Sequence, residues 1–203
     1  MDGLRLVLSL DYMDKDWERI KNGGFDGCLE VQRIVYILQL GGIRLGYHFS
    51  WYPPTSPYCE PLAAELEELS PQVTEHLRTL GSLRDAAMGK LDKVKSLLQP
   101  PAGLLRATWL ELVASIHYLL HIAYIPPDDR GGMSHLPAES IDERKGYVLQ
   151  LMTKVKPALK GHFEAAWDAL SRVGLIEAKA LPDGYSADRW VAACLDGDQV
   201  ETA

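Results

Sequence analysis

Cysteine is scarce in this chain of 203 residues: Cys28, Cys59 and Cys194 occur, and no two of them have the spacing of metal ligands. So small and odd a number is typical of a reducing compartment and argues against a disulfide framework. Long apolar runs are missing too, since no stretch reaches the roughly 18 residues of a membrane-spanning helix. Asp11 and Asp14 interrupt the N-terminal apolar stretch, which is too short for a signal peptide. We therefore expect a cytoplasmic protein without a membrane segment.

Positive charge is also limited. The chain has 21 Lys and Arg against 28 Asp and Glu, so the formal net charge is −7, and no run of basic residues occurs. A protein that neutralises many phosphates needs a local surplus of Lys and Arg. The best basic stripe, from Lys90 to Lys95, is short, with Arg78 and Arg84 scattered before it. The composition thus disfavours DNA as a partner without excluding it, and a basic partner suits the acidic chain better.

No motif for catalysis or cofactor binding is evident. Gly23-Gly24 and Gly131-Gly132 do not have the flanking pattern of a phosphate-binding loop, and no Ser–His–Asp arrangement can be read. We therefore expect no enzyme activity and no cofactor.

Helical spacing of apolar residues covers most of the chain. Gly41-Gly42 is a stop signal for the clearest helix of the first half, and Gln32 and Arg33 are expected off its apolar stripe. Ser70 followed by Pro71 predicts an N-cap and a first helical position. Ser140 is expected to cap a later helix. The expected helices are 4–10, 29–40, 60–69, 70–80, 83–98, 107–124, 140–156, 157–174 and 185–195, with 107–124 at the centre of the fold.

One aromatic segment breaks the helical pattern. Residues 43–52 alternate apolar and other side chains, which predicts an extended segment or a short strand. The prolines that follow it predict no regular strand pairing: Pro53, Pro54 and Pro57. We expect Tyr47, Phe49 and Trp51 to fill the core, and a surface role stays open for Tyr52 and Tyr58.

Four blocks carry a resemblance to known proteins: Val31–Leu38, Leu45–Tyr52, Ser56–Tyr58 and Leu62–Leu69. Their order and spacing resemble the YwgA-like family and, more distantly, the Panacea antitoxin domain of SocA-type proteins. The similarity covers roughly residues 29 to 175. It implies a winged helix-turn-helix core and an antitoxin-like role. This chain has Arg33 where the family usually has Lys, and Cys59 where it usually has Ser.

These observations predict a mainly α protein. A helix-turn-helix-like core with a short strand or hairpin would occupy residues 1–100, packed on a C-terminal helical bundle in residues 101–203. The leading hypothesis is a non-enzymatic protein-binding protein, an antitoxin-like or phage-defence-associated accessory factor whose partner is a toxin or another defence component. The alternatives are a winged-helix DNA-binding transcriptional regulator and an enzyme of unknown class, and a homodimer stays open. The residues expected to bind the partner are Arg33, Tyr52, Pro57, Tyr58, Glu65 and Glu68.

Two side-chain pairs support chemical alternatives. His117 and His121 lie four residues apart, so one helix face could present both to a metal, with His162 or Asp142 as third ligand. The competing interpretation is a helix–helix contact with local hydrogen bonds, and we therefore assign no metal. Cys59 precedes a helix and could be a nucleophile with His48 as its base, or simply a small residue before a helix.

Overall fold

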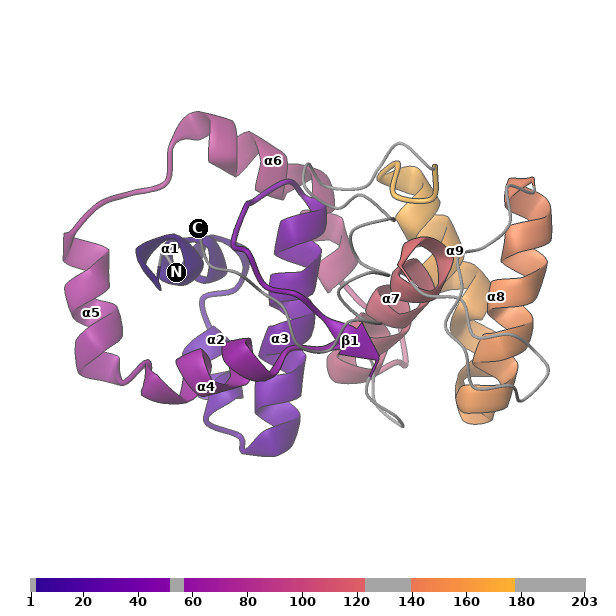
Figure 1. Cartoon of the computed structure of the whole chain (residues 1–203), viewed down its shortest axis with the longest axis horizontal. Helices are drawn as coiled ribbons and strands as arrows, with labels where there is room; N and C mark the ends of the chain where they lie inside the picture. Colours follow the sequence, from indigo (N-terminus) through magenta and orange to yellow (C-terminus); the bar gives the residue numbers. More distant parts are fainter. Residues whose placement is uncertain (1–2, 52–56, 123–139, 178–203) are drawn as a thin grey trace, which may run out of the picture. The chain divides into compact units, whose positions relative to one another are not determined.

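The computed structural model describes residues 3–51, 57–122 and 140–177 (Figure 1). These residues are mainly helical, with one two-stranded antiparallel sheet, which confirms the predicted mainly α class. The chain forms two compact units, Met1–Ala114 and Ser115–Ala203, and the boundary falls inside helix α7 (Arg106–His121). The helix-turn-helix-like core and the predicted division near residue 100 stay predictions.

Helix α3 (Phe25–Leu40) is the central element of the first unit. Every residue from Val31 to Leu40 is buried, because α1 (Gly3–Met13), α2 (Trp17–Lys21) and other helices all contact it (Figure 1). The helix begins earlier than predicted. The expectation that Gln32 and Arg33 lie off the apolar stripe was wrong, because both side chains are buried and satisfied by hydrogen bonds.

The extended segment after α3 keeps the alternation that the sequence predicts. Ile43, Leu45, Tyr47 and Phe49 are buried, while the residues between them are exposed. Trp51, expected in the core, is half-buried at the end of this segment.

A short hairpin follows the extended segment. Strand β1 (Ser50–Trp51) pairs with β2 (Pro57–Tyr58), with Ser50 opposite Tyr58 and Trp51 opposite Pro57. The expectation that the prolines prevent regular pairing was therefore wrong. Proline removes only one N–H donor, so it can occupy the first position of a strand that pairs over two residues.

Three more helices of the first unit follow the hairpin: α4 (Glu60–Glu68), α5 (Pro71–Thr79) and α6 (Asp85–Lys95). Helix α6 continues into a 3-10 turn, η1 (Ser96–Leu98). The predicted cap of α5 is confirmed, since the Ser70 hydroxyl accepts a hydrogen bond from the backbone N–H of Val73 at 3.3 Å. Gly41 allows α3 to end close to α6. A Cβ there would lie 2.9 Å from Val94 Cγ2 and 3.2 Å from the Lys90 carbonyl oxygen.

The second unit contains the end of α7, then α8 (Ile141–Val155), a 3-10 segment η2 (Pro157–His162) and α9 (Phe163–Arg172). Helix α9 buries one face with Phe163, Trp167 and Leu170, as its amphipathic spacing requires. The predicted helix over 157–174 thus begins as 3-10 turns, and the expected helix over 185–195 lies outside the described residues.

Candidate functional site

Two buried glutamines of α3 position the surface on which the predicted partner residues lie. The Gln39 side chain donates to the carbonyl of Tyr47 and accepts from its N–H, both at 2.9 Å. The Gln32 side-chain oxygen accepts from the N–H of Cys59 at 2.8 Å. Both ends of the hairpin region are therefore fixed to the most buried helix of the first unit, since a buried amide left without these bonds would be costly.

Most of the predicted partner-binding residues take part in internal contacts. Arg33 is 5% exposed and donates to the Ala107 carbonyl at 3.2 Å and to the Glu111 carboxylate at 3.1 Å. Burial lowers the pKa of Arg33, and the neighbouring Glu111 carboxylate opposes this change. Pro57 is buried in β2.

Two further predicted residues lie on α4. Glu65 accepts a hydrogen bond from the Tyr47 hydroxyl at 2.8 Å, and burial together with this bond raises the pKa of Tyr47. Glu68 is exposed, and Tyr58, just before α4, is half-buried. Tyr52 lies outside the described residues. Among the described members of the predicted set, Glu68 is therefore exposed to a partner, and Tyr58 is partly exposed.

A groove of about 450 Å³ adjoins Tyr58, between the α2–α3 junction and α4. Its lining includes Lys21, Phe25, Cys28, Tyr58, Leu66 and Glu67, and we call it the Phe25 groove. Phe25, the first residue of α3, is 58% exposed, which is unusual for a large aromatic side chain. Phe25 was not predicted as a site residue from the sequence, whereas Glu67 belongs to an acidic helix that could meet a basic partner. The only available signal for Phe25 was its place directly after Gly23-Gly24, where a helix begins.

The lining of the Phe25 groove includes one cation, Lys21, and one carboxylate, Glu67. The Lys21 ammonium donates to the carbonyls of Leu66 at 2.8 Å and Leu69 at 2.6 Å, so it caps the end of α4. Glu67 lines the groove and is exposed, and Glu68 follows it on the same helix. The accessible rim thus combines aromatic surface with carboxylates.

The histidine pair lies in the interior of the second unit. His117 is fully buried, His121 is 9% exposed, and their ring centres are 4.7 Å apart. His121 Nε2 lies 2.9 Å from the carbonyl oxygen of Leu175, which a neutral ring can satisfy as a donor. Burial lowers the pKa of both histidines, that of His121 to about 4. Asp142 is exposed, and the described residues include no group of three or more His, Cys, Asp or Glu side chains arranged to hold a metal.

Cys59 is in an environment that favours the neutral thiol. It is buried as the N-cap of α4, and this burial raises its pKa although backbone groups of Leu62 and His48 lower it. The side chain of His48 is on the exposed side of the alternating segment. This arrangement is the opposite of an activated cysteine, which needs an accessible and electropositive setting.

We therefore predict slow thiol chemistry at Cys59. In a variant with Cys28→Ser and Cys194→Ser, where Cys59 is the remaining thiol, reaction with an aromatic disulfide reagent at neutral pH should proceed at least about tenfold more slowly in the native protein than in urea, because the thiol is buried and protonated. The release of the coloured thiolate measures both rates. A fast native phase that disappears in His48→Ala would instead establish a Cys59–His48 pair.

The basic residues considered for DNA binding are partly engaged within the protein. Arg78 forms ion pairs with Asp11 and Glu18. Lys95 donates to the Tyr12 carbonyl at 3.2 Å and lies over the ring of that tyrosine. Lys93 is exposed on α6. The stripe expected from the sequence thus offers fewer charges to a phosphate backbone than its composition indicates.

Comparison with family models, with curated proteins and with solved structures gives no match for this chain. The resemblance to the YwgA-like and Panacea families therefore stays a prediction. In the part of the chain that the structure describes, no helix is both long and apolar enough to cross a membrane.

Proposed function

We propose that this chain is a non-enzymatic protein that binds a partner protein through the Phe25 groove, in the manner of an antitoxin-like or phage-defence-associated accessory factor. The observation that carries the proposal is an exposed aromatic side chain beside a groove of about 450 Å³ with a carboxylate at its rim. Aromatic residues in grooves are typical centres of protein interfaces. The antitoxin-like character rests on the resemblance alone.

The groove defines the chemistry of the partner. Phe25 and Tyr58 offer apolar surface, and Glu67 on the lining and the exposed Glu68 next to it supply negative charge in a chain whose net charge is −7. The complementary partner is a basic segment that inserts an apolar side chain between its charged residues. Because Glu65 is held by Tyr47, the carboxylates that meet the partner are Glu67 and Glu68.

Substitutions on the groove test this proposal. Phe25→Ala should weaken partner binding by about 2 kcal/mol or more, which is roughly 30-fold in Kd, because it removes the aromatic anchor. Glu67→Lys should slow association and make it less dependent on salt. The measurement is affinity capture from native lysate with wild type and variants side by side, followed by binding kinetics with the captured protein.

Matched control variants distinguish specific binding at the Phe25 groove from non-specific adsorption of proteins. Leu80→Ala removes another exposed apolar side chain, and Asp168→Lys reverses an exposed charge in the second unit. Both should leave capture unchanged. The proposal fails if no protein depends on Phe25 and Glu67, or if the controls lose the same protein. Retention of duplex DNA at low salt, abolished by Lys93→Glu, would favour the transcriptional regulator instead.

A further inference from the structure

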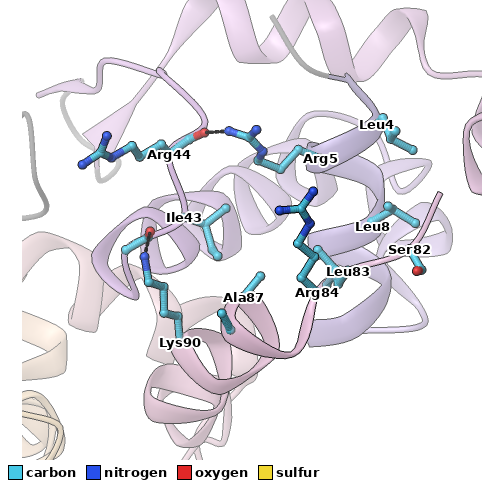
Figure 2. Close-up of a pocket in the computed structure, with 12 residues that line it drawn as sticks. Leu4, Arg5, Leu8, Ile43, Arg44, Ser82, Leu83, Arg84, Ala87 and Lys90 are labelled. Carbon is cyan, nitrogen blue, oxygen red and sulfur yellow. Dashed lines mark hydrogen bonds between the residues drawn. The ribbon is translucent and has the colours of Figure 1, made fainter. Parts of the chain in front are cut away.

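A second hollow, of about 550 Å³, lies elsewhere in the first unit, between α1, the loop after α3 and the start of α6 (Figure 2). Its lining includes Arg5, Arg44, Arg84 and Lys90, and no Asp or Glu among the residues that the structure describes lines it. We call it the basic pocket. In a chain with more acidic than basic residues, the charged groups of Arg5, Arg84 and Lys90 around one cavity are an unexpected concentration of positive charge.

Two of these cationic side chains, Arg84 and Lys90, belong to α6 and its N-cap. Arg84 is the N-cap of α6 and extends over the pocket in Figure 2. The ammonium of Lys90 lies 3.4 Å from the carbonyl oxygen of Gly42, where the close approach of α3 and α6 at Gly41 holds it. Neither side chain forms an ion pair with a carboxylate in the described part of the chain. Their charge is therefore available to an anion in the pocket.

The two remaining arginines frame the opening. The Arg5 guanidinium reaches the carbonyl oxygen of Arg44 at 3.0 Å, which fixes α1 to the loop after α3. The guanidinium of Arg44 points away from the pocket in Figure 2, so its backbone rather than its charge shapes the wall. Arg5 and Arg84 reach toward the same space from two different helices.

Most of the remaining lining is aliphatic, with Ser82 as its one uncharged polar side chain among the described residues. Leu4 and Leu8 come from α1, Ile43 from the loop after α3, Leu83 from the segment just before α6, and Ala87 from the first turn of α6. Leu4, Leu8 and Leu83 are each only partly buried, so this apolar surface is open to a ligand. Within the described ranges of the chain, no aromatic side chain lines the pocket, and a nucleobase would usually be held by stacking on such a side chain.

We propose that the basic pocket binds a small amphipathic anion, in which a phosphate or carboxylate group is attached to an aliphatic body. The anionic group would lie against the guanidinium of Arg84 and the ammonium of Lys90. The aliphatic body would cover the leucines. A cavity of about 550 Å³ is within the range that encloses small molecules.

Calorimetric titration of the full-length protein tests the ligand class. The probes are decyl phosphate and decanoate, each kept at concentrations where it is monomeric. The controls are inorganic phosphate, which has the anionic group alone, and octanol, which has an aliphatic chain without a charge. At least one of the two amphipathic probes should bind about tenfold or more tightly than inorganic phosphate and octanol, because both halves of the pocket contribute. The stronger of the two identifies the preferred anionic group. The proposal is overturned if neither binds, or if inorganic phosphate binds as tightly.

Variants test the location. Arg84→Glu should weaken binding of the preferred probe by at least about tenfold, since a charge-assisted contact becomes repulsive. Ala87→Phe should weaken it comparably by filling the apolar half without changing charge, and Arg84→Lys should retain most of it. Lys93→Glu is the matched control, because Lys93 is exposed on the same helix and does not line the pocket. Equal losses in Lys93→Glu and Arg84→Glu, with the circular dichroism of both unchanged, would overturn the assignment.

Discussion

Replacing Phe49 with alanine should lower the free energy of unfolding by about 3–5 kcal/mol, more than any other change considered for the first unit. The Phe49 side chain is fully buried and meets the ring of Tyr36 edge-to-face, with ring centres 5.1 Å apart and planes at 85°. Such a pair contributes about 0.5–1.5 kcal/mol beyond its buried area. Because Gln39 fixes the neighbouring Tyr47 backbone to α3, the segment cannot collapse into the space left by the ring.

Urea unfolding followed by circular dichroism and by tryptophan fluorescence measures this change. A single free energy is assigned only where the two traces coincide, since the chain has two units. Phe25→Ala is the control, because it removes the same side chain from a position that is 58% exposed, and it should cost less than about 1 kcal/mol. A loss below about 1 kcal/mol for Phe49→Ala would show that the aromatic segment does not belong to the core.

Local signals were sufficient to predict the features that depend on neighbouring residues. The Ser70-Pro71 pair placed the start of α5, and the alternation of Leu45, Tyr47 and Phe49 placed one face of the extended segment in the core. Both signals act within a few residues, through a cap and through the two-residue period of extended backbone. These predictions do not require knowledge of residues far away in the sequence.

The features that depend on distant residues could not be predicted in this way. Arg33 appears on a helix as an ordinary charged residue, and its burial depends on Glu111, which lies 78 positions further along the chain. The basic pocket joins residues of α1 to residues of α6, and no motif links them. No local sequence signal shows whether Phe25 is buried or exposed. The candidate sites are therefore products of tertiary packing, while the helices are largely products of local pattern.

Acidification should destabilise the second unit through His121, by about 3 kcal/mol between pH 6.5 and pH 4. Burial lowers the pKa of His121 from 6.5 to about 4 in the folded protein. Between these values the unfolded chain binds a proton that the folded chain does not. The stabilisation is thus complete above pH 6.5, falls as the pH drops toward 4 and is lost below it. His117, whose pKa is also lowered by burial, acts in the same direction.

His121→Gln isolates this contribution, because glutamine can still donate to the Leu175 carbonyl but does not titrate. Its free energy of unfolding, measured in urea at several pH values between 7 and 4, should fall less steeply than that of wild type. His76→Gln replaces an exposed histidine of the first unit and should follow wild type. Parallel pH profiles for wild type and His121→Gln would contradict a buried neutral His121. The prediction also separates the two interpretations of the histidine pair: a metal site would make the stability of this unit depend on zinc, whereas a helix contact makes it depend on pH alone.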